Sequence, residues 1–280
     1  MQFKPFKPIN LLLFACVFFL CKPNAGLAQA ANFPTGAGAA GMAGASVTRG
    51  DTWALFNNPA MLAQLENVSA GVNYENRFLV RELGISSIAA AMPTGPGTFG
   101  LAFNQFGSNL YSQTFAGLAY GRNFGGRFRA GVRLDARHTQ LAENGGRRTD
   151  LSFALGFAAN LTDNLVLAAA LFNPARISSA RDFDESLPAI YRAGLAYRIE
   201  TNLIITVEAE KDIRFKPTLR TGVEYSFKDI GALRAGIGTN PITHSFGFGF
   251  NFSDFTFDIA AVRHEVLGFS PQVSLIWIKK

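Results

Sequence analysis

Few residues of this sequence have the types and spacing that catalysis or cofactor binding requires. The histidines, His138, His244 and His264, are far apart, and none has a second histidine at the spacing of a metal site. No Gly-x-Ser-x-Gly motif marks a hydrolase nucleophile. Residues 36–41 match G-x-G-x-x-G, but no strand-like sequence precedes them and no βαβ pattern surrounds them. We therefore expect no enzyme, no metal ion and no cofactor.

The charged residues form the strongest polar constellation, because they alternate with apolar residues. In residues 128–136 every even-numbered side chain is apolar, whereas Arg129, Arg133 and Asp135 are charged. A period of two places the two sets on opposite faces of a strand. Mixed signs on neighbouring strands favour an internal salt-bridge network over a selectivity filter, which stays the alternative. The predicted polar network comprises Arg129, Arg133, Asp135, Arg137, Arg192, Arg198, Glu208, Glu210, Arg220, Glu224 and Asp258.

The elements that position this network are about fourteen predicted strands, with twelve as the alternative number. They follow one another between residues 67 and 280 with the same alternation of faces. Their ranges are 68–74, 83–91, 99–103, 114–121, 128–136, 151–161, 165–171, 191–199, 203–209, 219–227, 233–239, 245–252, 255–261 and 273–277. The fold class is therefore all-β.

The apolar faces of these strands favour a lipid environment. Residues 245–252 set four phenylalanines, at the even positions from 246 to 252, against glycine and asparagine. A soluble β-sandwich also alternates, but only a closed sheet leaves no unpaired edge in lipid. We therefore predict a transmembrane antiparallel β-barrel. Phe248→Arg should block assembly, at a cost of about 2–4 kcal/mol for a lipid-facing arginine at the midplane, whereas Gly249→Ser should be tolerated.

The connections between the predicted strands alternate in length. Residues 93–97 and 123–127 form short links, whereas residues 138–149 and 174–188 form longer ones. Outer-membrane barrels have their short turns at the periplasmic end, so both termini should be periplasmic. The link at residues 240–243 is an exception, because it is short where a long one is due.

The first thirty residues predict export. Lys4 and Lys7 precede an apolar run and small residues follow it, which is the order of a secretory signal peptide over residues 1–30. Both cysteines, Cys16 and Cys21, lie in this segment, so no disulfide or cysteine metal site is expected after cleavage. The net charge of +6 falls to about +3 without the signal peptide, which is too small to indicate a nucleic-acid partner.

Residues 31–66 do not alternate and are rich in glycine and alanine, so they predict a separate small element before the barrel strands. Their glycine-rich start, then Asp51, then Trp53-Ala-Leu-Phe-Asn-Asn-Pro-Ala-Met-Leu62 and the following strand resemble the start of mature FadL-superfamily proteins. The nearest branch resembles the PorV/PorQ-like proteins of the type IX secretion system of Bacteroidetes.

The resemblance implies a fourteen-stranded outer-membrane barrel with an N-terminal hatch that Asn58, Pro59 and Ala60 help to seat. It implies either transport of hydrophobic small molecules or service to secreted cargo and secretion-system proteins, with outer-membrane lipid as the surroundings. A non-conducting structural or partner-binding barrel is the alternative, and an outer-membrane enzyme is a third. Two departures stop a transfer of substrate residues: the chain is short for the family, and it ends in Lys279-Lys280.

Overall fold

The computed structural model describes residues 34–142, 146–175, 187–228 and 230–279. The predicted signal peptide, residues 1–30, lies outside these ranges. Within the described ranges no helix is long and apolar enough to cross a membrane.

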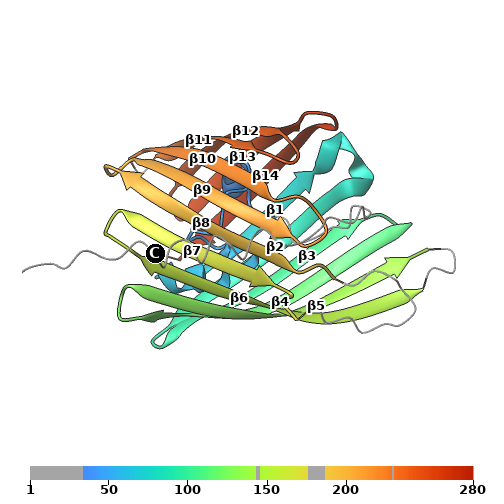
Figure 1. Cartoon of the computed structure of the whole chain (residues 1–280), viewed down its shortest axis with the longest axis horizontal. Helices are drawn as coiled ribbons and strands as arrows, with labels where there is room; N and C mark the ends of the chain where they lie inside the picture. Colours follow the sequence, from blue (N-terminus) through green and yellow to red (C-terminus); the bar gives the residue numbers. More distant parts are fainter. Residues whose placement is uncertain (1–33, 143–145, 176–186, 229, 280) are drawn as a thin grey trace, which may run out of the picture.

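Fourteen antiparallel strands form one closed barrel, in which each strand pairs with its sequence neighbours and β1 pairs with β14 (Figure 1). The strands are β1 (Ser69–Asn76), β2 (Gly84–Thr94), β3 (Gly97–Gly107), β4 (Tyr111–Phe124), β5 (Phe128–Leu141), β6 (Arg147–Asn160), β7 (Leu165–Phe172), β8 (Ile190–Ile199), β9 (Leu203–Asp212), β10 (Thr218–Phe227), β11 (Gly231–Gly238), β12 (Thr243–Phe252), β13 (Phe255–His264) and β14 (Gly268–Ile278). Two short 3-10 turns, η2 (Arg77–Leu79) and η3 (Arg81–Leu83), connect β1 to β2. The predicted barrel is confirmed.

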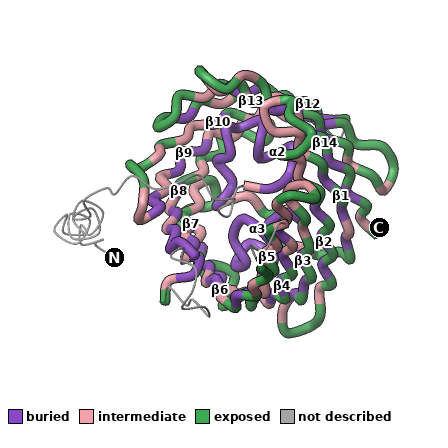
Figure 2. The backbone as a smooth tube through the Cα atoms, turned by 90° about the vertical axis from the view of Figure 1, so that its right-hand side faces the viewer, coloured by how far each residue is buried: buried purple, intermediate pink, exposed green. Residues whose placement is uncertain are grey.

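The two faces of the wall differ as the alternation predicts. Phe246 is 70% exposed on the outside of β12, whereas Arg133 and Glu208 on the inside are 0% exposed. Along the strands, exposed and buried positions alternate (Figure 2). The outer face is apolar enough for lipid, and the inner face carries the charges.

The strands β5 and β6 are longer than predicted. Residues 138–149 were expected as a loop, but β5 continues to Leu141 and β6 begins at Arg147. Beyond the apolar belt both faces of a strand are polar, so the alternation that identifies a strand disappears while its ladder of hydrogen bonds continues. Strand ends that project past the lipid are therefore hidden from a pattern of this kind.

An irregular segment lies inside the barrel, and we call residues 34–66 the plug segment. It contains α2 (Ala37–Ala40), α3 (Ala54–Asn57) and the 3-10 helix η1 (Pro59–Gln64), and Figure 2 shows its buried turns within the ring of strands. The Asn58 side chain caps η1 by accepting a hydrogen bond from the Ala60 amide, and Pro59 fits the first helical position because it needs no donor there.

Glycines of the wall let the plug segment approach the strands. A Cβ atom on Gly131 of β5 would lie 2.3 Å from the carbonyl carbon of Pro59. A Cβ atom on Gly222 of β10 would lie 2.4 Å from the Cβ of Met42. Any larger residue at these two positions would displace the plug segment from the wall.

Candidate functional site: the lumen and its plug segment

The plug segment is bound on one side by a buried carboxylate. Glu208 Oε2 on β9 accepts hydrogen bonds from the backbone amides of Ser46 (2.7 Å) and Val47 (2.8 Å). Its other oxygen, Oε1, faces two arginines, at 3.9 Å from Arg192 Nε and 3.6 Å from Arg220 Nη1. Glu208 thus joins the plug segment to an ionic cluster on the wall.

The same cluster contains Glu210, which fixes both arginines. Its carboxylate accepts from Arg192 Nε at 2.6 Å and from Arg220 Nη2 at 2.9 Å. The four residues come from three adjacent strands, β8, β9 and β10, and each charge faces an opposite one. Such mutual pairing is what makes buried charge tolerable in a barrel wall.

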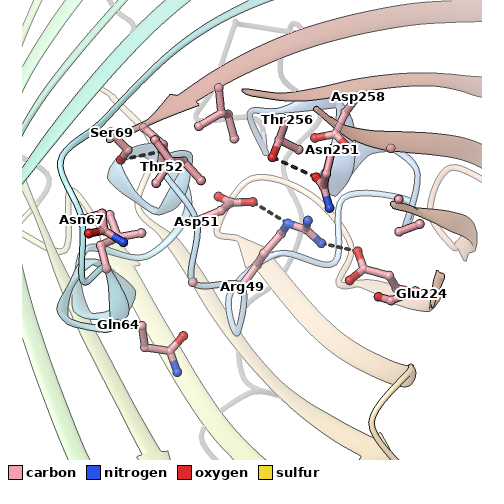
Figure 3. Close-up of a pocket in the computed structure, with 18 of the residues that line it drawn as sticks. Arg49, Asp51, Thr52, Gln64, Asn67, Ser69, Glu224, Asn251, Thr256 and Asp258 are labelled. Carbon is pink, nitrogen blue, oxygen red and sulfur yellow. Dashed lines mark hydrogen bonds and ion pairs between the residues drawn. The ribbon is translucent and has the colours of Figure 1, made fainter. Parts of the chain in front are cut away.

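A second ionic cluster holds the plug segment through Arg49 (Figure 3). Arg49 pairs with Asp51 of the plug segment, and its Nη1 donates to Glu224 Oε2 on β10 at 2.7 Å. Glu224 also accepts from Arg234 on β11, whose Nη1 donates to Asp258 Oδ1 at 2.6 Å. Burial disfavours a charged guanidinium, but the carboxylates of Glu224 and Asp51 outweigh it and raise the pKa of Arg49 above its ordinary value.

Two polar cavities lie beside residues 48–51, one of about 420 Å³ and one of about 260 Å³. Both are lined by Arg49, Asp51 and Glu224. The larger also reaches Ser69 and Ile278, at the start of β1 and the end of β14, so it lies at the end of the barrel that carries the short turns. Residues 48–51 therefore separate two polar spaces at this mouth.

The opposite side of the plug segment packs against the wall with apolar groups. Leu55 and Phe56 of α3, with Met61 and Leu62 of η1, are at most 2% exposed. They share one apolar cluster with alanines of the wall and with Phe115. The helix η1 contacts β3, β4, β5 and β6. This side of the plug segment is therefore held mainly by apolar burial.

One buried arginine, Arg133, lies on the apolar side of the plug segment. The Arg133 guanidinium lies 5.0 Å from the ring centroid of Phe115 and 5.7 Å from that of Phe172, within cation–π range of both. It pairs with Asp135 at 2.6 Å and donates to the carbonyl of Leu55 in the plug segment. A fully buried cation is thereby stacked, paired and tied to the plug segment at once.

Three arginines of the predicted network remain, and one of them, Arg137, lies over the same Phe115 ring as Arg133. Arg129 donates to Asn160, and Arg137 donates to Gln113 at 3.3 Å. Arg198 is exposed near the short-turn end and lines the smaller cavity. The predicted network is thus divided into three ionic clusters, with Arg137 beside the third and with Arg129 and Arg198 elsewhere.

The predicted hatch residues all belong to the plug segment. Asp51 accepts from Arg49 and from the Trp53 amide, and Asn58 Nδ2 donates to the carbonyl of Val47 at 2.7 Å. Pro59 and Ala60 begin η1 against β5 and β6. These contacts are structural, and none involves a cavity-lining group of the wall.

Sequence reasoning missed two arginines of the ionic clusters, Arg49 and Arg234. Arg234 lies between the outward residues Leu233 and Ala235, so the alternation could have found it, whereas Arg49 lies in a segment without a period. The tolerance predicted for Gly249→Ser stays a prediction, because a Cβ there would lie 2.4 Å from Asp258 Oδ1 and 2.8 Å from Arg234 Nη1, which are the ends of side chains that can shift.

The sequence matches no family model and no curated protein, whereas the structure resembles several solved barrels. The toluene transporter TbuX of Ralstonia pickettii has a TM-score of 0.67 at 12% identity, over 86% of this chain and 96% of TbuX. A FadL homologue of Pseudomonas aeruginosa has a TM-score of 0.66 at 13% identity, over 87% and 98%. The toluene transporter TodX of Pseudomonas putida has a TM-score of 0.64 at 12% identity, over 92% and 98%. The chain therefore has the fold of the FadL-like outer-membrane barrels.

Proposed function

We propose that this protein transports small hydrophobic molecules across the outer membrane, and that the plug segment is the barrier they must pass. The observation that carries the proposal is a closed fourteen-stranded barrel whose lumen holds its own N-terminal segment. Its fold covers most of two toluene transporters as well as most of this chain.

The apolar outer face supports an outer-membrane location, because only lipid stabilises a wall of this kind. The chain enters β1 and leaves β14 at the end with the short turns, which supports periplasmic termini. The lumen supports a role for the plug segment as a barrier, because contacts on both of its sides hold it across the interior.

Two of the solved structures named above are toluene transporters and none is named as an enzyme, which supports a non-enzymatic function. A role in type IX secretion stays a prediction from the N-terminal motif. A non-conducting structural barrel is tested by the same experiment, because such a barrel would take up nothing.

The experiment compares toluene uptake by cells with and without the protein, and then locks the plug segment. The Cβ of Ala43 lies 3.9 Å from the position of a Cβ on Gly238 of β11, which is within the range of a disulfide. Both native cysteines lie in the predicted signal peptide, so Ala43→Cys with Gly238→Cys should form one defined crosslink.

We expect the native protein to raise toluene uptake, the oxidised double variant to lose that increase, and a reductant to restore it. The two single-cysteine variants are the controls for the substitutions themselves. The absence of any increase with the native protein would overturn the proposed substrate class. Full uptake by a verified, oxidised crosslink would show that the plug segment need not move.

A further inference from the structure

The outer face of the wall carries a hollow that the lumen does not explain. It has a volume of about 620 Å³ and is lined mainly by outward apolar side chains of β2–β6. Ile88, Leu134 and Leu151 on its surface are 54%, 60% and 61% exposed. The hollow therefore opens toward lipid, not toward the plug segment.

The strand register explains why the wall is hollowed here. Ile88, Phe103, Ala116, Ala136 and Leu151 are paired in this order across β2, β3, β4, β5 and β6, and so form one row around the barrel. The two alanines are adjacent in that row, between a phenylalanine and a leucine. Two small side chains between larger ones produce a groove.

The width of the groove decides what can occupy it. Neighbouring strands lie about 4.8 Å apart, so two alanine strands leave a channel roughly one hydrocarbon chain wide. A helix with its side chains is about 10 Å across and could not enter it. The groove thus suits an acyl chain better than a transmembrane helix of a partner protein.

The next row toward the long-loop end is polar at every strand. It consists of Ser86, Gln105, Thr114, His138 and Thr149, again paired in this order. The apolar belt on this side of the barrel therefore ends directly beside the two alanines. A lipid with its chain in the groove would have its head group at this polar row.

The charge of the side chains beside the polar row favours a lipid with an anionic head group. One row further, Ser112 of β4 pairs with Gln140 of β5, which pairs with the exposed Arg147 of β6. None of the outward residues of β2–β6 in these two polar rows is acidic. The nearby Asp150 is 2% exposed on the lumen face, where it pairs with Arg148 at 2.7 Å.

We propose that the outer face of β2–β6 is a specific binding site for an anionic lipid. One acyl chain lies over Ala116 and Ala136, and the phosphate lies beside Arg147 and His138. The His138 Nδ1 and Thr149 hydroxyl are 2.9 Å apart, which holds the imidazole at the head-group level. This site is independent of transport through the lumen.

The test uses native mass spectrometry of the detergent-purified full barrel, titrated with phosphatidylglycerol or phosphatidylcholine. We expect discrete binding of phosphatidylglycerol and weaker binding of phosphatidylcholine. Ala116→Phe fills the groove and should weaken phosphatidylglycerol binding about tenfold, which corresponds to the loss of about two methylene contacts. Arg147→Gln should weaken it about fivefold, and should abolish the preference for the anionic lipid.

The matched control is Ala235→Phe, which adds the same side chain at an exposed alanine of β11 outside the groove. It should leave lipid binding unchanged, and heat-modifiable gel migration verifies that every variant is folded. An equal loss of phosphatidylglycerol binding in Ala116→Phe and Ala235→Phe, or no loss in either, would contradict the placement of the acyl chain in the groove. Equal binding of phosphatidylglycerol and phosphatidylcholine by the native protein would contradict the placement of an anionic head group beside Arg147 and His138.

Discussion

The two sides of the plug segment are held to the barrel by different physical forces. Toward β3–β6, Leu55 and Phe56 are packed among wall alanines, and burial of apolar area provides the free energy. Toward β9 and β10, Glu208 and Glu224 bind backbone amides and Arg49. Apolar packing tolerates small shifts, whereas charge-assisted hydrogen bonds require one geometry. The comparison indicates that the apolar side stabilises the plug segment and the ionic side fixes its position.

Two tryptophans allow the comparison to be measured. Trp53 lies buried in the plug segment and Trp277 lies on the outer face of β14, and the chain has no others. In a Trp277→Phe background, Trp53 emission during urea denaturation in lipid vesicles therefore reports on the plug segment alone.

The largest effect is expected for Glu208→Ala. This change removes the acceptor of two buried amides, and it removes one of the two carboxylates, Glu208 and Glu210, that face Arg192 and Arg220. Breaking a buried ionic cluster in this way should destabilise the plug segment by about 3–5 kcal/mol. Glu208→Gln retains an acceptor and is the control, for which the loss should be smaller. A loss below about 1 kcal/mol for the alanine variant would contradict the importance of this cluster.

A smaller loss is expected for Leu55→Ala on the apolar side. Leu55 is 0% exposed and its Cδ2 lies 2.3 Å from the position of a Cβ on Gly100, so truncation leaves a cavity. The free energy of unfolding should fall by about 2–4 kcal/mol. Because the lost contacts are apolar, the difference in the free energy of unfolding between this variant and the native protein should be the same at low and high salt. A strongly salt-dependent difference would show that the apolar and the ionic contacts of the plug segment do not act independently.

The smallest change in stability is expected for Arg49→Gln. Arg49 is 19% exposed beside the mouth cavities, so its pairs with Asp51 and Glu224 are partly screened. We expect a loss of about 1 kcal/mol, which 1 M salt should largely abolish. Arg49→Lys, which keeps the charge, is the control. A loss equal to that of Glu208→Ala would place the main ionic anchor at the mouth instead.

The wall could be predicted from the sequence because lipid and lumen impose opposite chemistry on alternate residues. That contrast persists along β12, where Phe246 and Phe248 face outward. It fails at the end of β5 and the start of β6, where the outward residues are His138, Gln140, Arg147 and Thr149. The same alternation placed Arg133 and Glu208 on one face but could not pair the charges. Partners depend on strand register, which a pattern of faces leaves open.

The plug segment was less accessible to prediction. Its helices contain four to six residues and show no hydrophobic period, so Arg49 carried no signal of its partner Glu224, which lies 175 residues away. Its position inside the barrel could be predicted only from the resemblance of the N-terminal motif to FadL-superfamily proteins. The long-range contacts that hold it exist only once the barrel has closed.

Ion conductance across planar bilayers tests the central claim most directly, which is that the plug segment closes the lumen. The native protein should leave the conductance close to that of the bare bilayer, whereas deletion of residues 34–64 should produce large, stable conductance steps through a lumen lined by charged residues. Heat-modifiable gel migration verifies that the deleted protein is a folded barrel. Equal conductance of the native and the folded, deleted protein would contradict the account.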